Sequence, residues 1–386
     1  MKIIHTITRL EGGPGVTTPV LVEEMSRLGH DVSLLYGSSD IYDPSGRSDH
    51  KKSMDLKSFF IPAMKRNISL KKDTRALIEI VRVFLKERPD VVHTHESKDG
   101  TLARVAAKLC RVPVVLRSYH GLVYYDNYFG KKTSVVKPAI IGIEKVLNIL
   151  TDRVISLSDS LTDEIVDEFA LCPRTKITVI PNYYKLDNFI KLNKSSFLNK
   201  ELNIRDGARI ITVVANFQPP KEHVTILKSF NLVLKEKGFE DAHLVLVGEG
   251  PLRGLIEENI KEMKLGNRVH LLGFRNDIPD ILSSTDLFLM GSKSEGTPGA
   301  MIQALAAGCR VVGTIVGGIP DLLENGKYGS MSVFGDPDAL RNAIVSEFEI
   351  IRDHDVIRKS IEEKYGVSNV AARFLALYES ILMGKL

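Results

Sequence analysis

Short apolar segments alternate with amphipathic segments along nearly the whole chain. A strand of a parallel sheet is buried on both faces and is joined to the next strand through a helix, so this alternation predicts parallel α/β sheets. The expected strands are Lys2–Thr6, Asp31–Tyr36, Val91–Thr94, Val114–Arg117, Arg153–Leu157, Lys176–Ile180, Ile210–Ala215, His243–Gly248, Val269–Leu272, Leu287–Met290 and Arg310–Gly313. The expected helices are Thr17–Leu28, Leu70–Glu87, Thr101–Cys110, Val136–Leu150, Ser158–Glu168, Thr225–Lys237, Leu252–Lys264, Ile278–Ser283, Gly299–Ala307, Asp338–Phe348 and Asn369–Met383.

A break in this alternation predicts two domains. The chain has 386 residues, more than a usual single domain, and the polar stretch 191–205 lacks periodicity. We expect one Rossmann-like domain at residues 1–190 and a second at 206–365, with 366–386 forming a helix that packs back toward the first. Because ligands bind beyond the carboxyl ends of strands in doubly wound sheets, the two domains are expected to face a cleft that holds the site.

Composition indicates a folded protein of ordinary character. Hydrophobic residues make up 44% and charged residues 26%, which argues against extended disorder. No charged-then-apolar leader and no apolar run of membrane-spanning length is evident, so a cytoplasmic location is expected. Cys110, Cys172 and Cys309 lack CxxC spacing, which argues against a disulfide framework and a zinc site.

One basic cluster stands out. Residues 51–75 contain eight lysines and arginines against two aspartates. Such a cluster is either a solvated loop and helix face or a surface that attracts anionic lipid headgroups or a pyrophosphate-bearing acceptor. Both interpretations stay open from the sequence.

The segment from Glu295 to Gly308 joins a carboxylate, a Gly-containing turn and a helix start. A helix beginning here would direct the free N–H groups of Gly299 and Ala300, with the positive end of its dipole, at an anion such as phosphate. Glu295, just outside that helix, would accept hydrogen bonds from a polyol. The segment resembles the donor site of the retaining family 4 glycosyltransferases, in which two acidic residues lie eight positions apart, and the second position is Gln303 here.

A glycine-rich loop with Gly13, Pro14 and Gly15 follows the first expected strand and opens the first expected helix. Glycines at such a place let the backbone approach a phosphate, although a turn needed only for packing is the alternative. The dinucleotide-binding fingerprint fits poorly, because Thr18 stands where a third small residue belongs. The loop resembles the Gly-Gly turn of the family, which faces the donor diphosphate.

Two further positions fit the same resemblance. Lys221, after the first strand of the second half, would supply a point charge for the diphosphate. The family usually carries an arginine five positions earlier, where this chain has Asn216, which donates a hydrogen bond without neutralising charge. His120 matches the His-Gly turn of the family near the transferred sugar, although a single histidine is more often structural.

Two more strand-to-helix turns resemble family segments near the nucleotide. One contains Gly248, and the other contains Phe274 and Arg275, whose backbone atoms would recognise the edge of the base. Because any α/β turn favours glycine, a turn role alone also explains these residues.

No metal site is predicted. His93 and His95 form a His-x-His at a strand end without a third ligand in sight, so a structural or cleft-lining role is expected. The Asp-x-Asp matches at 336–338 and 353–355 fall at a helix start and in a charged surface stretch, so neither is assigned a metal.

The resemblance implies a GT-B enzyme with two Rossmann-like domains. It implies transfer of a hexose-type sugar from a nucleoside diphosphate donor, with a UDP-sugar favoured, to a lipid-linked glycan with retention of configuration. His120, Lys221 and Glu295 would be catalytic. Neither cofactor nor nucleic acid is implied. Capsule or lipopolysaccharide synthesis at the inner face of the cell membrane, with peripheral contact through residues 51–75, is the expected setting.

Two alternatives remain. A nucleotide-sugar epimerase of the same architecture would change its substrate without an acceptor. A catalytically inactive nucleotide-sugar binding protein is suggested by Asn216 and Gln303, which stand at two positions that usually carry charge.

Overall fold

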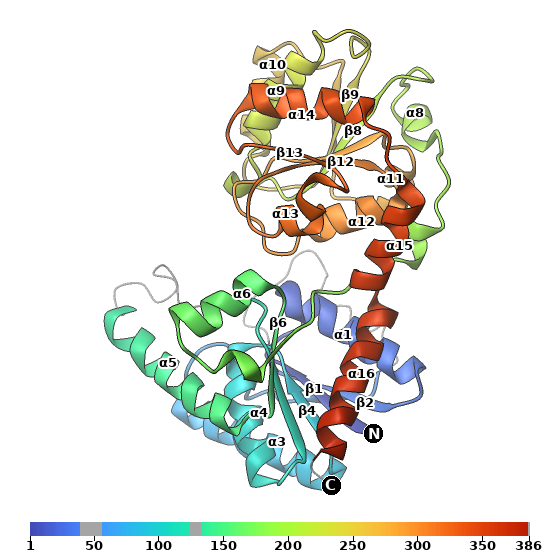
Figure 1. The fold of residues 1–386 in the computed structure, drawn as a ribbon. Helices are drawn as coiled ribbons and strands as arrows, with labels where there is room; N and C mark the ends of the chain where they lie inside the picture. The colour runs from blue at the N-terminus through green and yellow to red at the C-terminus, as the bar shows by residue number, and fades with distance from the viewer. Residues whose placement is uncertain (39–55, 123–132, 385–386) are drawn as a thin grey trace. The chain divides into compact units, whose positions relative to one another are not determined.

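The computed structural model describes residues 1–38, 56–122 and 133–384, which form two units (Figure 1). Unit 1 consists of Met1–Tyr184 and Val367–Leu386, and unit 2 of Lys185–Gly366. The first boundary therefore lies at 184/185 instead of 190, and the stretch expected as a linker belongs to unit 2.

Unit 1 is built on a seven-stranded parallel sheet with the order β3-β2-β1-β4-β5-β6-β7. Its strands are β1 (Lys2–Ile7), β2 (Asp31–Tyr36), β3 (Ser58–Phe60), β4 (Val91–Thr94), β5 (Val114–Ser118), β6 (Arg153–Ser156) and β7 (Ile177–Val179). Its helices are α1 (Gly12–Arg27), α3 (Leu70–Glu87), α4 (Ser97–Leu109), α5 (Thr133–Leu150), α6 (Asp159–Asp163) and α16 (Val367–Met383), with a short π-helix at Glu164–Glu168 and a 3-10 helix at Arg174–Lys176.

Helices cover both faces of this sheet because neighbouring residues of a strand point to opposite faces. Ile3 packs in a cluster with Leu21 of α1 and Phe374 of α16, whereas Ile4 packs with Ile80 of α3 and Ala103 of α4. Helix α16 lies beside α1, as Figure 1 shows. The core of unit 1 thus includes a helix that follows the whole of unit 2 in the sequence.

Unit 2 is built on a six-stranded parallel sheet with the order β10-β9-β8-β11-β12-β13. Its strands are β8 (Ile210–Val214), β9 (His243–Val247), β10 (Val269–Gly273), β11 (Leu287–Met290), β12 (Arg310–Thr314) and β13 (Ser330–Ser332). Its helices are α7 (Asp187–Ile190), α8 (Phe197–Glu201), α9 (His223–Val233), α10 (Arg253–Glu262), α11 (Ile278–Ser283), α12 (Gly299–Ala307), α13 (Ile319–Leu322), α14 (Pro337–Glu349) and α15 (His354–Tyr365), with short turns at Pro219–Lys221 and Glu324–Gly326.

Alternation again places the two faces of this sheet in different cores. Leu244 packs with Phe230 of α9 and Ile344 of α14, while the next residue, Val245, packs with Ile281 of α11. In both sheets the strand order reverses at one point, between β1 and β4 and between β8 and β11. The loops at the carboxyl ends of these strands are where ligands bind in doubly wound sheets.

Several elements were not predicted. Strands β3 and β13 have three residues each and lie at sheet edges, and α15 follows the capping side chain of Asp353 within the stretch interpreted as charged surface. Among the described residues, no helix combines the length and apolar character needed to cross a membrane.

Candidate functional site

In unit 2 the loops after β8 and β11 bring Lys221 and Glu295 together. Nζ of Lys221 lies 2.5 Å from Oε1 of Glu295, and the hydroxyl of Ser292 donates to the same oxygen at 2.5 Å. The N–H of Lys293 donates to the carbonyl of Pro220 at 2.8 Å, which fixes the two loops to each other. Two predicted site residues that are 74 positions apart therefore form one charged pair.

The pair leaves its cation accessible. The side chain of Lys221 is 26% exposed and that of Glu295 is 9% exposed. An ammonium group that reaches solvent beside a mostly covered carboxylate can contact a ligand phosphate, while the carboxylate holds the lysine in place and offers an acceptor to hydroxyl groups.

Helix α12 begins directly after this pair. It starts at Gly299, and its N-cap Pro298 supplies no side-chain cap. The N–H groups of Gly299 and Ala300 belong to the first turn, which has no intrahelical acceptors. Gln303 follows one turn later and is partly exposed. The helix thus begins at Gly299, as predicted from the sequence, and anion binding at its start stays a prediction.

Glycines in the adjoining turns are required by packing. Gly317 has φ +51°, and a Cβ there would lie 1.7 Å from the carbonyl oxygen of Glu295. Gly248 has φ +147°, and a Cβ there would lie 2.0 Å from the carbonyl oxygen of Ala215. Close contact between backbones therefore accounts for glycine at both positions, including the predicted donor residue Gly248.

The predicted base-recognition turn follows β10. Phe274 is 56% exposed, whereas Arg275 is engaged within unit 2. Its Nε donates to Asp277 at 2.7 Å and its Nη1 to Glu201 at 2.6 Å. These hydrogen bonds raise the pKa of Arg275 above its ordinary value. The guanidinium of Arg275 thus connects α8 to this turn. The other predicted donor residue, Asn216, is exposed in the turn after β8.

In unit 1 the predicted phosphate loop forms the first turn of α1. A Cβ on Gly15 would lie 2.6 Å from the carbonyl carbon of Leu10, so packing requires glycine there. A Cβ on Gly13 would meet no atom within 4 Å, so packing does not require glycine at that position. Pro14 lines a cavity that is described below.

His120 ends a chain of three hydrogen-bonded histidines, of which His95 and His5 are buried. Its Nε2 lies 3.1 Å from Nδ1 of His95, whose Nε2 lies 2.9 Å from Nδ1 of His5. Burial lowers the pKa of His120 and of His5 to about 3, and lowers that of His95 well below its ordinary value. Neutral imidazoles donate with one nitrogen and accept with the other, so each ring of the chain constrains the tautomer of the next.

His93 joins this cluster to the C-terminal helix. Its Nδ1 lies 2.6 Å from the hydroxyl of Tyr378 in α16, and its Nε2 lies 2.7 Å from the hydroxyl of Ser118. The ring nitrogens of His5, His93 and His95 are close enough to share a metal ion. Both nitrogens of His93 are hydrogen-bonded, whereas Nε2 of His5 is buried without a hydrogen-bond partner among the described residues. His5 is the third nearby nitrogen ligand that the sequence did not reveal.

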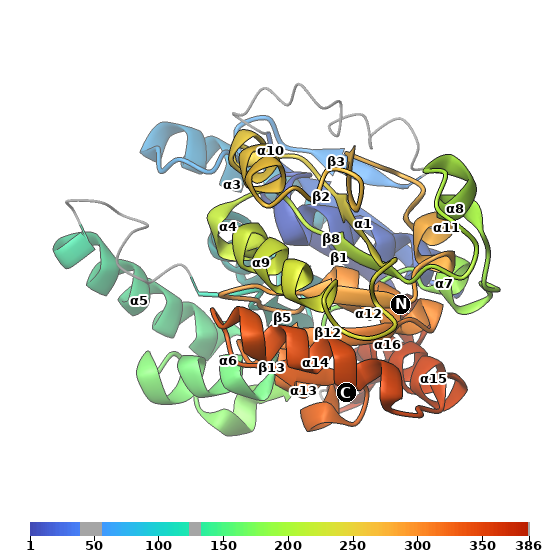
Figure 2. The same ribbon diagram turned by 90° about the horizontal axis from the view of Figure 1, so that it is seen from above.

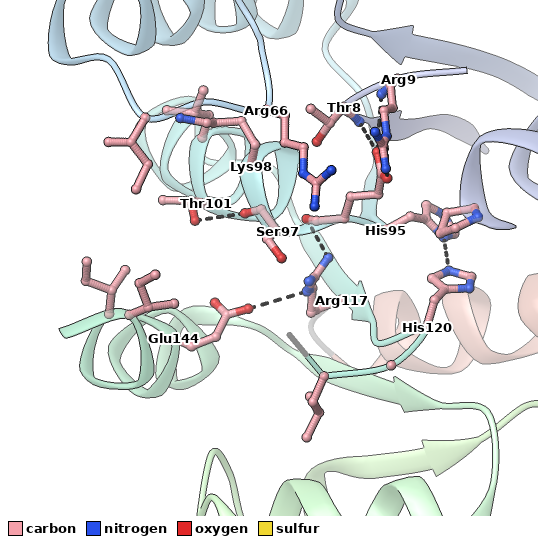
Figure 3. Close-up of a pocket in the computed structure, with 18 of the residues that line it drawn as sticks. Thr8, Arg9, Arg66, His95, Ser97, Lys98, Thr101, Arg117, His120 and Glu144 are labelled. Atoms are coloured by element: carbon pink, nitrogen blue, oxygen red, sulfur yellow. Dashed lines mark hydrogen bonds and ion pairs between the residues drawn. The ribbon is translucent and has the colours of Figure 1, made fainter. Parts of the chain in front are cut away.

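A cavity of 570 Å³ opens at the switch point of unit 1, beyond β1 and β4 (Figure 3). Its charged lining residues are Arg9, Arg66, Asp73, Glu96, Lys98, Arg117 and Glu144. Its apolar lining residues are Pro14, Ile68, Leu102, Leu122, Ile140 and Ile143, and His95 and His120 also face it. The cavity therefore combines cations with an apolar wall.

Buried charges form the floor of this cavity. Nε of Arg117 lies 3.5 Å from Glu144, and Arg104 makes a hydrogen-bonded ion pair with the same carboxylate. Burial alone would raise the pKa of Glu144, but the charges of Arg104 and Arg117 hold it below its ordinary value. Nη1 of Arg117 also donates to the carbonyl of Glu96 at 2.7 Å. The floor is thus a buried network in which both arginines contact the carboxylate of Glu144.

Glu96 lies at the start of α4 and connects it to the loop after β1. Its Oε2 accepts hydrogen bonds from the N–H groups of Thr8 at 2.8 Å and Arg9 at 3.2 Å. Burial, followed by the charge of Asp99, raises the pKa of Glu96 to about 7. A carboxyl group in the cavity therefore changes its charge near neutral pH.

Sequence reasoning missed Glu96, Arg104, Arg117 and Glu144. One signal was present, because Arg117 interrupts an otherwise apolar strand, and a charge in such a place requires a partner. The identity of that partner was not readable, since Glu144 belongs to a helix that pairs with it only in the folded unit.

Comparison with known proteins identifies the family. The model described as Glycosyltransferase Family 4 matches residues 11–188, and that described as Glycosyl transferases group 1 matches residues 208–349. An Escherichia coli protein named UDP-Gal:alpha-D-GlcNAc-diphosphoundecaprenol alpha-1,3-galactosyltransferase is 33% identical over 272 residues, covering 70% of this chain and 69% of that protein. The chain belongs to glycosyltransferase family 4.

Other relatives agree with this assignment. The N-acetyl-alpha-D-glucosaminyl L-malate synthase of Bacillus anthracis is 25% identical over 85% of this chain and 82% of its own length. Among solved structures, a glycosyltransferase from Rickettsia africae superposes with a TM-score of 0.80 at 16% identity, covering 99% of this chain and 98% of its own. The prediction of a two-domain GT-B fold is confirmed.

Fold alone does not separate the activities considered from the sequence. Anabaena HepE in complex with UDP has a TM-score of 0.77 at 17% identity, covering 98% of this chain and all of its own. A UDP-GlcNAc 2-epimerase from Neisseria meningitidis has a TM-score of 0.66 at 16% identity, covering 98% and 100%. Family membership, and not the fold, identifies this family 4 protein as a glycosyltransferase.

Proposed function

We propose that this family 4 glycosyltransferase moves a hexose-type sugar from a UDP-sugar to a lipid-linked diphosphate glycan, with retention at the anomeric carbon. The observation that carries the proposal is the Lys221–Glu295 pair beside the start of α12. Cation, carboxylate and helix dipole converge there in a way that suits a diphosphate bearing a sugar. The name of the E. coli relative supports both the donor and the acceptor class.

Each residue has a role in this proposal. As the bond between the anomeric carbon and the diphosphate breaks, negative charge grows on the leaving oxygen. Lys221 and the N–H groups of Gly299 and Ala300 would stabilise this charge. Gly13 and Gly15 would add backbone donors. Glu295 and His120 would hold sugar hydroxyls, with His120 neutral because of its burial.

No protein base is assigned. The acceptor oxygen would form the new bond on the face that the diphosphate leaves, and its proton would pass to a leaving phosphate oxygen. With Asn216 at the position of the usual arginine, charge stabilisation rests more on Lys221. Gln303 would hydrogen-bond the ribose as a neutral amide, and the backbone of Phe274 and Arg275 would read the base. Neither a metal nor a cofactor is included.

The acceptor is assigned to unit 1. The cavity there joins cations to an apolar wall, which suits a diphosphate linked to a lipid. We place the reaction in cell-surface polysaccharide synthesis at the inner face of the membrane. The basic cluster predicted at residues 51–75 falls partly outside the described residues, and its described part includes Arg66 in the cavity lining.

A donor and acceptor panel tests the proposal. Purified protein is incubated with UDP-galactose and other UDP-, GDP- and ADP-sugars, with and without polyprenyl diphosphate N-acetylglucosamine. We expect nucleoside diphosphate release only with acceptor, a product heavier by one hexose, and an α-linkage by NMR from an α-linked donor. Glu295→Gln should abolish turnover, while Glu258→Gln, on the exposed face of α10, should not.

The alternatives give different results. An epimerase would convert the UDP-sugar without acceptor. An inactive binding protein would bind UDP without turnover, and Asn216→Arg with Gln303→Glu would then test whether the missing charges are the cause. A β-linked product would contradict retention of configuration but not the rest of the proposed function.

A further inference from the structure

Helix α5 presents an unusual outer face. From residue 138 onward its exposed residues are Pro138, Ala139, Gly142, Ile143, Lys145, Val146, Ile149 and Leu150. Val146 is 59% exposed and Ile149 is 76% exposed. The polar residues Glu144 and Asn148 are buried instead. A surface helix normally has the opposite arrangement, with its apolar stripe toward the core.

This apolar face lies at the margin of unit 1. Figures 1 and 2 both show α5 at the periphery of the unit, with its first turns farthest from the sheet. Exposed apolar side chains scattered singly need no explanation, but several on one helix face indicate an interaction surface.

The same face continues into the cavity of unit 1. Ile140 and Ile143 of α5 line the cavity, and Ile68, which is 77% exposed, lines it from the segment before α3. Ile143 therefore belongs both to the apolar wall of the cavity and to the outer face of α5. An apolar chain that leaves the cavity beside Ile143 would meet the exposed apolar side chains of α5, which would reduce its contact with water.

Cations lie beside the same cavity. Arg66 and Lys98 line it, with Lys98 in an ion pair with Asp73. The exposed first turns of α3, which follow Ile68, carry Lys71 and Lys72, and Arg75, which pairs with Glu79. Lysine and arginine beside an apolar face attract anionic lipid headgroups, and this combination is typical of helices that lie in the membrane interface.

We propose that the outer face of α5, formed by Ile143, Val146, Ile149 and Leu150, docks on an anionic lipid bilayer. Helix α5 would lie in the interface plane, with the cations at the start of α3 beside the headgroups. The inference rests on the proposed function in one respect, because a lipid-linked diphosphate would then enter the cavity of unit 1 directly from the bilayer.

Vesicle sedimentation tests the docking surface without any substrate. The full-length protein is mixed with vesicles of phosphatidylglycerol and phosphatidylethanolamine, and separately with phosphatidylcholine vesicles. The variant Val146→Gln/Ile149→Gln changes two exposed residues outside the cavity. The matched control is Ile351→Gln/Val356→Gln in unit 2, where the two side chains are 98% and 55% exposed.

We expect wild type and control to bind the anionic vesicles, and the α5 variant to bind them about tenfold less or weaker still. Equal binding by both variants would overturn the proposal. A concentration-dependent dimer that the α5 variant alone loses, without vesicle binding by wild type, would overturn it in favour of a second copy of the chain. Thermal unfolding of unit 1 at the same temperature in the α5 variant and in wild type checks that α5 remains folded.

Catalysis is measured separately on a water-soluble acceptor with a short prenyl chain. Unchanged turnover by the α5 variant, together with lost vesicle binding, supports the docking surface. Absence of turnover by every protein, including wild type, would count against the proposed function and would leave the vesicle result to decide the membrane surface by itself.

Discussion

The buried network around Glu144 gives the sharpest prediction for stability. The change Glu144→Gln keeps the shape of the side chain and removes its charge. The side chains of Arg104 and Arg117 are 0% and 4% exposed, so two guanidinium groups would remain buried without their common counterion. Arg104 would keep its hydrogen bond to Asn148, at 2.8 Å, which does not neutralise charge.

Breaking a buried pair by removing one partner destabilises a protein by about 3–5 kcal/mol. For a unit of roughly 200 residues each kcal/mol lowers the melting temperature by about 2–4 °C, so the expected change is roughly 6–20 °C. Differential scanning calorimetry suits a chain with two units, because only the transition of unit 1 should move.

The matched control is Glu79→Gln in α3. Glu79 pairs with Arg75 at the surface, with side chains 23% and 74% exposed, and such a helix pair contributes only about 0.5 kcal/mol. If Glu144→Gln melts at the same temperature as this control, the ionised network does not stabilise unit 1 and the reasoning is refuted.

The pH dependence provides a second check. The pKa of Glu144 is lower in the folded chain than its ordinary value of 4.5. Its contribution is therefore fully present above pH 4.5 and is lost as the pH falls through the folded pKa. The acid loss of stability of unit 1 should be shallower in Glu144→Gln than in wild type.

Three further predictions concern other parts of the molecule. Lys221→Met should lower kcat by about 10²–10³, since one stabilising group for the leaving diphosphate is lost, and steady-state kinetics at saturating donor would detect this. Gly13→Ala should keep the melting temperature of unit 1 and lower turnover, because a Cβ at position 13 meets no atom within 4 Å. Gly248→Ala should lower the melting temperature of unit 2, because a Cβ at position 248 clashes with backbone. Equal melting of the two variants would contradict this. The pKa of His120 falls from 6.5 to about 3 on folding, so urea unfolding should show unit 1 losing stability as the pH drops from 6.5 toward 3, and less so in His120→Asn.

Local sequence patterns predicted the elements that bury a continuous apolar stripe. The helix predicted at Leu70–Glu87 has the same bounds as α3. Strand β3, with the sequence Ser-Phe-Phe, was not predicted, because its pairing with β2 defines it and three residues carry no pattern of their own. Helix α15 was not predicted, because its charged residues are typical of an exposed loop. Its N-cap Asp353 and its packing on α12 are evident only in the structure.

The candidate site shows the same division. Glu295 and Lys221 were recognisable one at a time, from a helix start and from a turn after a strand. Their contact was not, since it depends on two loops meeting at a sheet edge. The charged floor of the cavity was missed because a charged residue in a sequence is ordinarily expected at the surface.

The position of helix α16 in the sequence affects the order in which the two units can complete their cores during synthesis. Its buried Tyr378 packs in the core of unit 1, which otherwise ends at Tyr184. During synthesis the ribosome must therefore translate all of unit 2 before unit 1 can close its core, so unit 2 has every residue it needs first. A nascent chain halted after Gly366 would carry a finished second unit and an open first one, with Phe374 and its neighbours missing from the apolar surface that they cover. Helix α16 is thus synthesised after unit 2, although its side chains pack in the core of unit 1.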